Sequence, residues 1–134
     1  MRASKNAAKT ILVAGGSGII GRALVRNLGK CDPLKVIAAS RRPEINLPKN
    51  TVPLSIDLNH AKRVNSEVLR DVTHFVYSAY VDAVSWEAQR EPNINLFENS
   101  MQFVTFNCPD LQHVTLLQGT KAYGAHLGPF KTPA

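Results

Sequence analysis

Five short segments rich in apolar, β-branched and aromatic residues are spaced along the chain between turn-forming residues. Short apolar runs bounded by turn residues are typical of strands in a parallel sheet, where helices cover both faces. The five predicted strands are residues 11–14, 36–39, 52–58, 72–77 and 113–117. Pro53 cannot donate a ladder hydrogen bond, so the third of these strands is expected at the edge of the sheet.

Helical periodicity is present between these strands. Residues 18–28 carry one apolar stripe, and Gly29 follows as a helix stop. The stripe consists of Ile20, Leu24, Val25 and Leu28. Residues 59–69 and 95–106 are two further predicted helices, and Pro92 marks the expected start of the second. The proline-containing stretch 43–50 is predicted as a surface loop.

Strands and helices alternate throughout, at spacings that suit right-handed βαβ crossovers. The expected fold class is therefore α/β, with a doubly wound parallel sheet of the Rossmann type. Numbered along the chain, its strands should lie in the order 3-2-1-4-5. The sixth strand of that fold is missing, so we interpret the domain as C-terminally truncated. We expect a basic tail over residues 1–10 and an incomplete Rossmann domain over 11–134.

Charge and cysteine content narrow the classes of partner. Sixteen Lys and Arg against ten Asp and Glu give a net charge of +6, which favours an anionic partner. The basic residues are scattered with only two adjacent pairs, so no nucleic acid binding is predicted. Cys31 and Cys108 are far apart in sequence, which indicates neither a disulfide framework nor a zinc site and favours a cytoplasmic location. No apolar run is long enough to cross a membrane.

A glycine-rich loop follows the first predicted strand. Gly15, Gly18 and Gly21 form a GxxGxxG pattern at the junction with the first helix. Such a loop permits a tight turn, brings backbone close to a pyrophosphate, and aims a helix N-terminus at the phosphates. We therefore assign this loop, with Ser17, Ile19 and Ile20 between and beside the glycines, to a dinucleotide. The alternative is a flexible turn without a ligand.

The end of the second strand indicates which dinucleotide. An NAD site would place a carboxylate here for the ribose 2′-hydroxyl, but the chain has Ser40, Arg41 and Arg42. Guanidinium groups match phosphate oxygens, so the predicted cofactor is NADP(H), bound through its 2′-phosphate. The alternative is that both arginines are solvated loop residues.

Two more strand ends complete the predicted cofactor site. Asp57 and Leu58 close the third strand where an adenine would lie, and Asp57 is a candidate acceptor for the adenine amino group. A cap for the following helix explains Asp57 nearly as well. Ser78, Ala79 and Tyr80, at the end of the fourth strand, are expected along the nicotinamide ribose. Strand-end packing explains them equally well.

Six motifs, in this order and spacing, carry a resemblance over about residues 11 to 130. They are VAGGSGIIG (13–21), ASRRP (39–43), DVTH (71–74), NCPDL (107–111), QGTKAY (118–123) and GPF (128–130). Together they resemble the atypical short-chain dehydrogenases of the progesterone 5β-reductase and iridoid synthase group. The resemblance implies an NADPH-dependent reduction of an enone or other small carbonyl compound, in secondary metabolism.

The resemblance also assigns a catalytic lysine to Lys121. The family's tyrosine lies beyond the last residue of this chain, and none of Tyr77, Tyr80 and Tyr123 begins a YxxxK motif. Two hypotheses follow: the chain is the cofactor-binding part of a reductase, or it is an inactive nucleotide-binding module or partner subunit. An unpaired fifth strand would expose a sheet edge, which predicts possible self-association.

Overall fold

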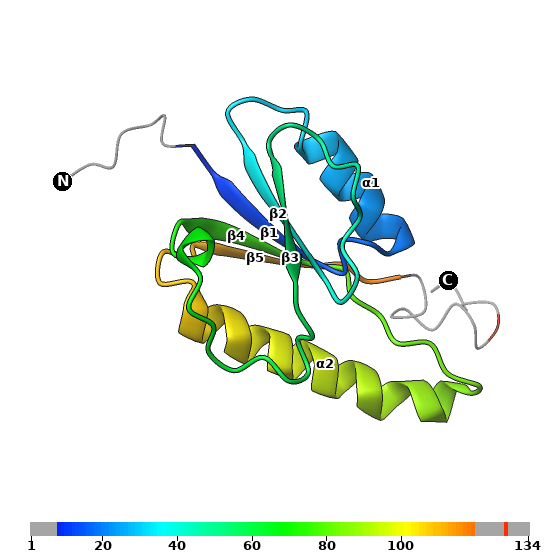
Figure 1. Ribbon diagram of the computed structural model, residues 1–134. Coiled ribbons are helices and arrows are strands. Elements are labelled where there is room, and N and C mark those ends of the chain that lie inside the picture. Colours follow the sequence, from blue (N-terminus) through cyan, green and yellow to red (C-terminus); the bar gives the residue numbers. More distant parts are fainter. Residues whose placement is uncertain (1–7, 120–127, 129–134) are drawn as a thin grey trace, which may run out of the picture.

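The computed structural model describes residues 8–119 and residue 128. They form a five-stranded parallel sheet in the order β3-β2-β1-β4-β5, as predicted (Figure 1). The strands are β1 (Thr10–Ala14), β2 (Lys35–Ser40), β3 (Thr51–Ser55), β4 (Val72–Tyr77) and β5 (His113–Leu116). The predicted fold class and strand order are confirmed. Strand β3 ends at Ser55, three residues earlier than predicted.

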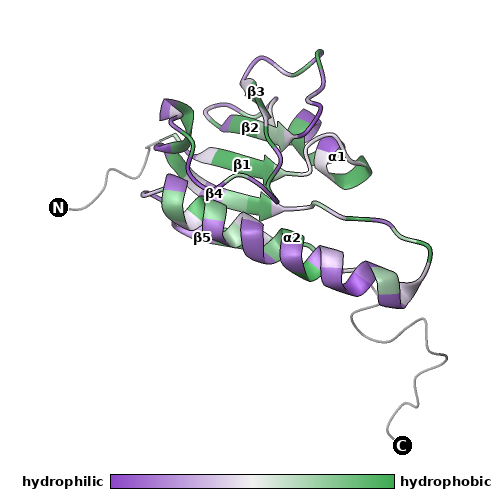
Figure 2. Cartoon of the chain, turned by 60° about the horizontal axis from the view of Figure 1, so that its bottom comes forward, coloured by the Kyte–Doolittle hydropathy of each residue, from purple (hydrophilic) through white to green (hydrophobic). Residues whose placement is uncertain are grey.

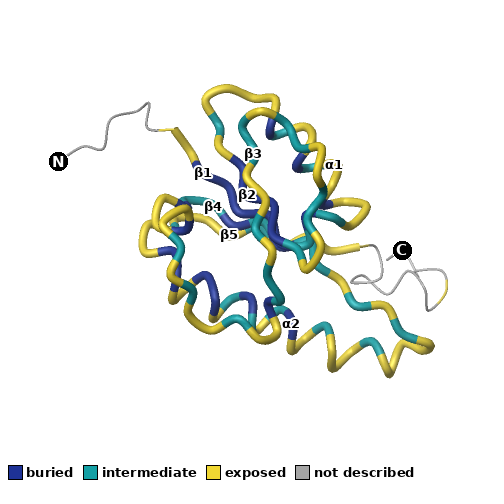
Figure 3. The backbone as a smooth tube through the Cα atoms, viewed as in Figure 1, coloured by how far each residue is buried: buried dark blue, intermediate teal, exposed yellow. Residues whose placement is uncertain are grey.

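Strand β1 lies in the middle of the sheet, and all five of its residues are buried (Figure 3). Leu12 pairs with Ile37 of β2 on one side and with Phe75 of β4 on the other. The apolar run at 11–14 has no polar side because both faces are covered by other elements, as expected for a central parallel strand.

The helices α1 (Ile19–Leu28) and α2 (Trp86–Asn107) cover opposite faces of the sheet (Figure 1). Successive side chains of a strand point to opposite faces, so β1 contributes to two separate clusters. Val13 packs in the cluster that contains Val25 of α1. Leu12 packs in the cluster that contains Phe103 and Val104 of α2. Figure 2 shows the apolar residues concentrated along the strands between these helices.

The helix predicted over 59–69 is wrong. Within that segment the structure has turns and only a short 3-10 helix, η1 (Glu67–Leu69). Asn107, at the end of α2, replaces the helical hydrogen bonds: its Oδ1 accepts from the Val64 amide at 3.0 Å, and its Nδ2 donates to the Lys62 carbonyl at 3.0 Å. A tertiary contact therefore satisfies backbone groups that a helix would have paired.

The helix predicted over 95–106 exists but starts earlier, so the prediction that Pro92 marks its start is wrong. It begins at Trp86, with Pro92 inside it. Ser85 is the N-cap, and its hydroxyl accepts from the Ala88 amide at 3.2 Å. The buried residues of α2 all lie from Leu96 onward, where the helix crosses the sheet (Figure 3).

Strands β3 and β5 are the two edges of the sheet, and both are mostly exposed (Figure 3). The prediction that Pro53 marks an edge strand is confirmed. Among the described residues β5 pairs with β4 alone, and self-association through it stays a prediction. Across the described part of the chain, no helix combines the length and apolar character that crossing a bilayer requires.

Candidate functional site

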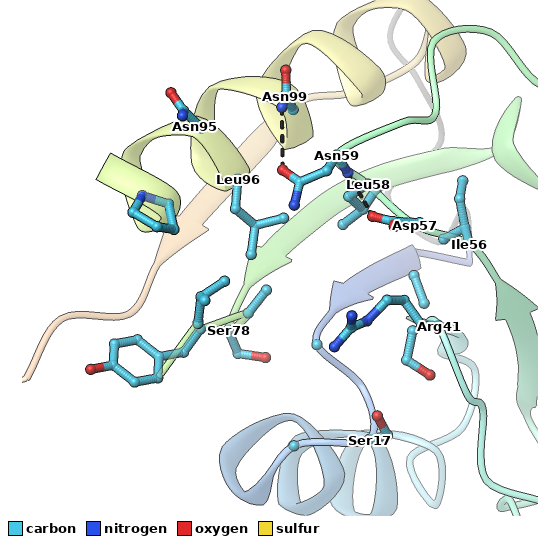
Figure 4. A pocket seen from close by; sticks show the side chains of 18 of the residues that line it. Ser17, Arg41, Ile56, Asp57, Leu58, Asn59, Ser78, Asn95, Leu96 and Asn99 are labelled. Carbon is cyan, nitrogen blue, oxygen red and sulfur yellow. Dashed lines mark hydrogen bonds between the residues drawn. The ribbon is translucent and has the colours of Figure 1, made fainter. Parts of the chain in front are cut away.

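A cavity of about 1290 Å³ lies at the carboxyl ends of the strands (Figure 4). Its wall combines the loop after β1, the end of β2, the turn after β3, the residues after β4 and one side of α2. In open α/β sheets, ligands bind outside the carboxyl ends of the strands where the strand order reverses, here between β1 and β4. Eleven of the thirteen residues assigned to the cofactor lie in this wall, and Gly21 and Arg42 do not.

Backbone packing explains why the loop after β1 needs glycine. Gly15 has a φ of +77°, and a β-carbon there would lie 2.8 Å from backbone atoms of Ala79. The amides of Gly15 and Gly16 donate to the Ala39 carbonyl at 3.1 and 3.0 Å, which joins the loop to the end of β2. A β-carbon on Gly21 would lie 1.9 Å from the Gly15 carbonyl oxygen. Gly21 therefore allows α1 to pack closely against the loop after β1, and the part of this loop that lines the cavity precedes Gly21.

The N-terminus of α1 opens into this cavity with no capping group of its own. Gly18 is the N-cap and supplies no side-chain hydrogen bond, and the first turn holds no acidic residue. The first amides of a helix have no acceptor within the helix, and they carry the positive end of its dipole. Ile19 and Ile20 line the cavity with exposed fractions of 93% and 57%. This arrangement fits a ligand with an anionic group and an apolar surface.

The end of β2 lies beside the glycine loop in the cavity wall. The guanidinium of Arg41 points into the cavity (Figure 4). The hydroxyl of Ser40 is buried in the wall without a hydrogen-bond partner. Arg42 is exposed and does not line the cavity. The two arginines predicted as a pair therefore differ, and Arg41 is the one that lines the cavity.

Asp57 organises the turn after β3. Its Oδ1 accepts from the Asn59 amide at 3.0 Å, and its Oδ2 lies 3.0 Å from Nδ1 of His60. The pKa of the Asp57 carboxyl is below its usual value. The hydrogen bond with His60 is the main cause, and the hydrogen bond from the Asn59 amide is the next. The predicted alternative role as a helix cap is wrong, since a turn and not a helix follows. The carboxylate remains in the cavity wall beside buried Leu58.

The residues after β4 are fixed by β1. Ser78 donates to the Ala14 carbonyl twice, from its amide at 3.1 Å and from its hydroxyl at 2.6 Å. Ala79 lies against Gly15, so these residues bring the end of β4 directly against the glycine loop. Ser78 therefore both packs at the end of the strand and lines the cavity, so both of the predicted explanations hold for it.

The sequence patterns did not predict that α2 forms part of the cavity wall. Asn95, Leu96 and Asn99 line it, and Asn99 Nδ2 donates to Asn59 Oδ1 at 3.2 Å (Figure 4). That bond joins the helix to the turn after β3. Asn95 and Asn99 are four residues apart and therefore share one helix face. This spacing of two amides was the available signal in the sequence.

A second group of residues lies where β4 leads into α2, and it includes Tyr80, which was expected along the nicotinamide ribose. Tyr80 lines the cavity and donates from its hydroxyl to Oε1 of Gln89. Gln89 Nε2 donates to Asp82 Oδ1 at 2.8 Å, and Asn93 bonds both the amide and the carbonyl of Val81. The first part of α2 thus holds this connection in place through side-chain amides.

The predicted catalytic residue, Lys121, lies outside the described residues. Within the described part of the chain, no group of three or more His, Cys, Asp or Glu residues could hold a metal ion. His74 and His113 lie across β4 and β5 with ring centroids 5.8 Å apart, away from the cavity wall. Burial lowers the pKa of His74 below its usual value, and repulsion from Lys9 and His113 lowers it further.

The sheet order, the glycine loop and the cavity at the strand ends define a Rossmann-type domain. The family model described as a PRISE-like Rossmann-fold domain matches residues 11–134. The chain belongs to this family. The resemblance to the progesterone 5β-reductase and iridoid synthase group, inferred from six motifs, is confirmed by that match and by the relatives.

Two curated relatives come from plants. An (S)-8-oxocitronellyl enol synthase from Nepeta racemosa is 29% identical over 96% of this chain and 34% of the relative. A 3-oxo-Δ(4,5)-steroid 5β-reductase from Arabidopsis thaliana is 33% identical over 89% of this chain and 32% of the relative. The chain thus spans about a third of the length of these relatives.

The fold is also that of solved structures. The crystal structure of Gre2 from Candida albicans superposes with a TM-score of 0.67 at 20% identity, covering 85% of this chain and 37% of that one. At this identity the similarity concerns the fold alone.

Proposed function

We propose that this chain is the cofactor-binding part of an NADPH-dependent reductase that acts on an enone or other carbonyl compound, in secondary metabolism. One observation carries the proposal: the uncapped N-terminus of α1 and the Arg41 guanidinium face one cavity at the strand ends. The names of the relatives, a steroid 5β-reductase and enol synthases, support the class of substrate.

The residues present fit a phosphorylated dinucleotide. Gly15 allows the tight turn against Ala79, and Gly18 adds no side chain where α1 meets the cavity. The first amides of α1 would hold the oxygens of a pyrophosphate. Arg41 would bind the 2′-phosphate, with the unpartnered Ser40 hydroxyl beside it. Asp57, Leu58 and Asn99 would surround the adenine. When bound, the reduced nicotinamide supplies a hydride; Ser78 and Ala79 would position its ribose.

Arg41→Ala is expected to weaken NADPH binding by about tenfold or more and to leave NADH binding nearly unchanged, because a charge-assisted hydrogen bond to the 2′-phosphate is lost. Fluorescence titration with each nucleotide measures both constants. Arg42→Ala is the matched control, since it removes the same charge from an exposed position outside the cavity wall. Equal affinity of the unaltered chain for NADPH and NADH would contradict the choice of NADPH.

An enone-dependent NADPH oxidation assay separates this function from the alternative of a nucleotide-binding module without turnover. A hydride delivered to an enone builds negative charge on its oxygen, which needs a positioned proton donor. The resemblance assigns the charge to Lys121, and no tyrosine among residues 11–134 matches the family's proton donor. We therefore expect these residues to bind the nucleotide with little or no turnover. Robust turnover would show that another residue of the chain provides the proton.

A further inference from the structure

We propose that Arg22 is a positioning residue for cofactor selectivity, which holds Glu44 away from Arg41 and ties the loop after β2 to the glycine loop. The proposal rests on the proposed function, because it concerns how the same cavity distinguishes NADPH from NADH. Arg22 does not line the cavity, so it would act only through the residues it holds.

The contacts of Arg22 join two segments that are far apart in sequence. Its Nε lies 2.5 Å from Oε1 of Glu44, in the loop after β2. Its Nη2 donates to the carbonyl of Ser17 at 3.1 Å, in the glycine loop. Ser17 and Arg41 both line the cavity (Figure 4). One guanidinium therefore fixes the spacing between the expected pyrophosphate and 2′-phosphate sites.

Besides Asp57, whose carboxylate is bonded to the Asn59 amide and to His60, Glu44 is the acidic side chain nearest in sequence to Arg41. It follows Arg41 by three residues, and a carboxylate at this end of β2 is the group that favours NAD. A carboxylate left free on the same short loop would have a high effective concentration near the Arg41 guanidinium. It would pair with that guanidinium and repel a phosphate.

In the structure, Glu44 instead forms ion pairs with two arginines of α1. Its side chain is 23% exposed, and its second oxygen, Oε2, lies 3.7 Å from Nη2 of Arg26. Both carboxylate oxygens are thus directed to guanidiniums on the outer face of α1. Arg22 makes the shorter contact with Glu44 and also reaches the glycine loop, whereas Arg26 is ion-paired with Glu44 alone among the described residues. The two arginines therefore provide a comparison within one helix.

Five variants test the proposal: Arg22→Met, Arg22→Lys, Glu44→Gln, the double variant of Arg22→Met with Glu44→Gln, and Arg26→Met as the matched control. Fluorescence titration gives the dissociation constants of NADPH and NADH, and thermal unfolding checks that each variant is folded. We expect Arg22→Met to weaken NADPH about fivefold and NADH at most about twofold, since exposed ion pairs contribute modestly. Arg26→Met should change the ratio of the two constants less than Arg22→Met does.

The double variant tests whether the charge of Glu44 causes the loss of selectivity in Arg22→Met. With Glu44 uncharged, its competition for Arg41 disappears, so the ratio of NADPH to NADH affinity should return to within about twofold of the unaltered chain. The small loss shared by both nucleotides should remain, because Ser17 is still unsupported. Arg22→Lys should keep most of the ratio, since an ammonium still holds Glu44. A double variant that keeps the lowered ratio would overturn the proposal.

Failure of the proposed function gives a different result. If the unaltered chain binds neither nucleotide, or binds NADPH and NADH equally, both the function and this inference are overturned. If the unaltered chain prefers NADPH and Arg22→Met weakens both nucleotides in the same proportion, the function stands and only the role of Arg22 in selectivity is overturned.

Discussion

Gly21→Ala is expected to lower the free energy of unfolding by about 3 kcal/mol, because the added methyl group has no space. Its β-carbon would lie 1.9 Å from the Gly15 carbonyl oxygen and 2.9 Å from the Ser78 hydroxyl oxygen. The Gly15 carbonyl is fixed by the Gly18 amide at 3.0 Å, and the Ser78 hydroxyl is bonded to Ala14. Neither can yield, so α1 itself must move away from the sheet.

Chemical denaturation of the two proteins measures this loss. Gly18→Ala is the control, since it adds the same methyl group three residues earlier, where the one atom within 4 Å is the Gly15 oxygen at 3.3 Å. It should cost less than about 1 kcal/mol, the usual range for a changed N-cap. Similar losses for the two variants would mean that α1 does not pack against β1 as closely as described.

The strand order and the glycine loop could be predicted because their signals are local. A run such as 11–14 is apolar at every position, which indicates a central parallel strand without knowledge of its neighbours. Gly15, Gly18 and Gly21 lie between that strand and an amphipathic helix, and this context distinguishes them from an ordinary turn. The prediction of which residues approach the cavity was correspondingly good around Ser17 and Ile20.

The segment after β3 could not be predicted because a distant residue determines it. Helical periodicity in 59–69 is genuine, since Val64 and Leu69 both pack against the core. The backbone there is nevertheless bonded by Asn107, which is more than forty positions further along the chain. A polar side chain buried at the end of α2 gives no local sign of this role.

The start of α2 was missed for a related reason. Proline is usually favoured in the first turn of a helix and disfavoured inside it, which made Pro92 the expected start. The earlier turns are held instead by Gln89 and Asn93, which bond the loop at 81–83. Because the helix was predicted too short and unattached, its contribution to the cavity wall was missed as well.

Sequence also could not separate Arg41 from Arg42. The two residues are adjacent and chemically identical, and both lie in the bend that follows β2. Arg41 follows Ser40 into the cavity wall, and Arg42 is exposed outside it. Which of the two arginines reaches the cavity depends on the path of the chain where it leaves the sheet after β2, and that path is a tertiary property.

Gly18→Asp should abolish nucleotide binding while leaving the fold intact or slightly stabilised. Aspartate is a better N-cap than glycine, and Gly18 has an extended backbone with φ −73° and ψ 172° that any residue adopts. The free energy of unfolding should therefore rise by up to about 0.5 kcal/mol. The same carboxylate would lie where a pyrophosphate is expected, and repulsion between charges about 4 Å apart near a protein surface amounts to several kcal/mol. We expect NADPH affinity to fall about a hundredfold or more.

Gly18→Asn separates the two causes of that loss. Asparagine caps a helix about as well as aspartate, so both variants occupy the first amides of α1 with a side-chain oxygen. Only aspartate adds a charge, and its excess loss over asparagine measures the repulsion directly. That excess should shrink at high salt, because solvent ions screen a partly open site. If the two variants lose NADPH equally, the N-terminus of α1 does not face an anion, and if neither loses it, the dinucleotide lies elsewhere in the cavity.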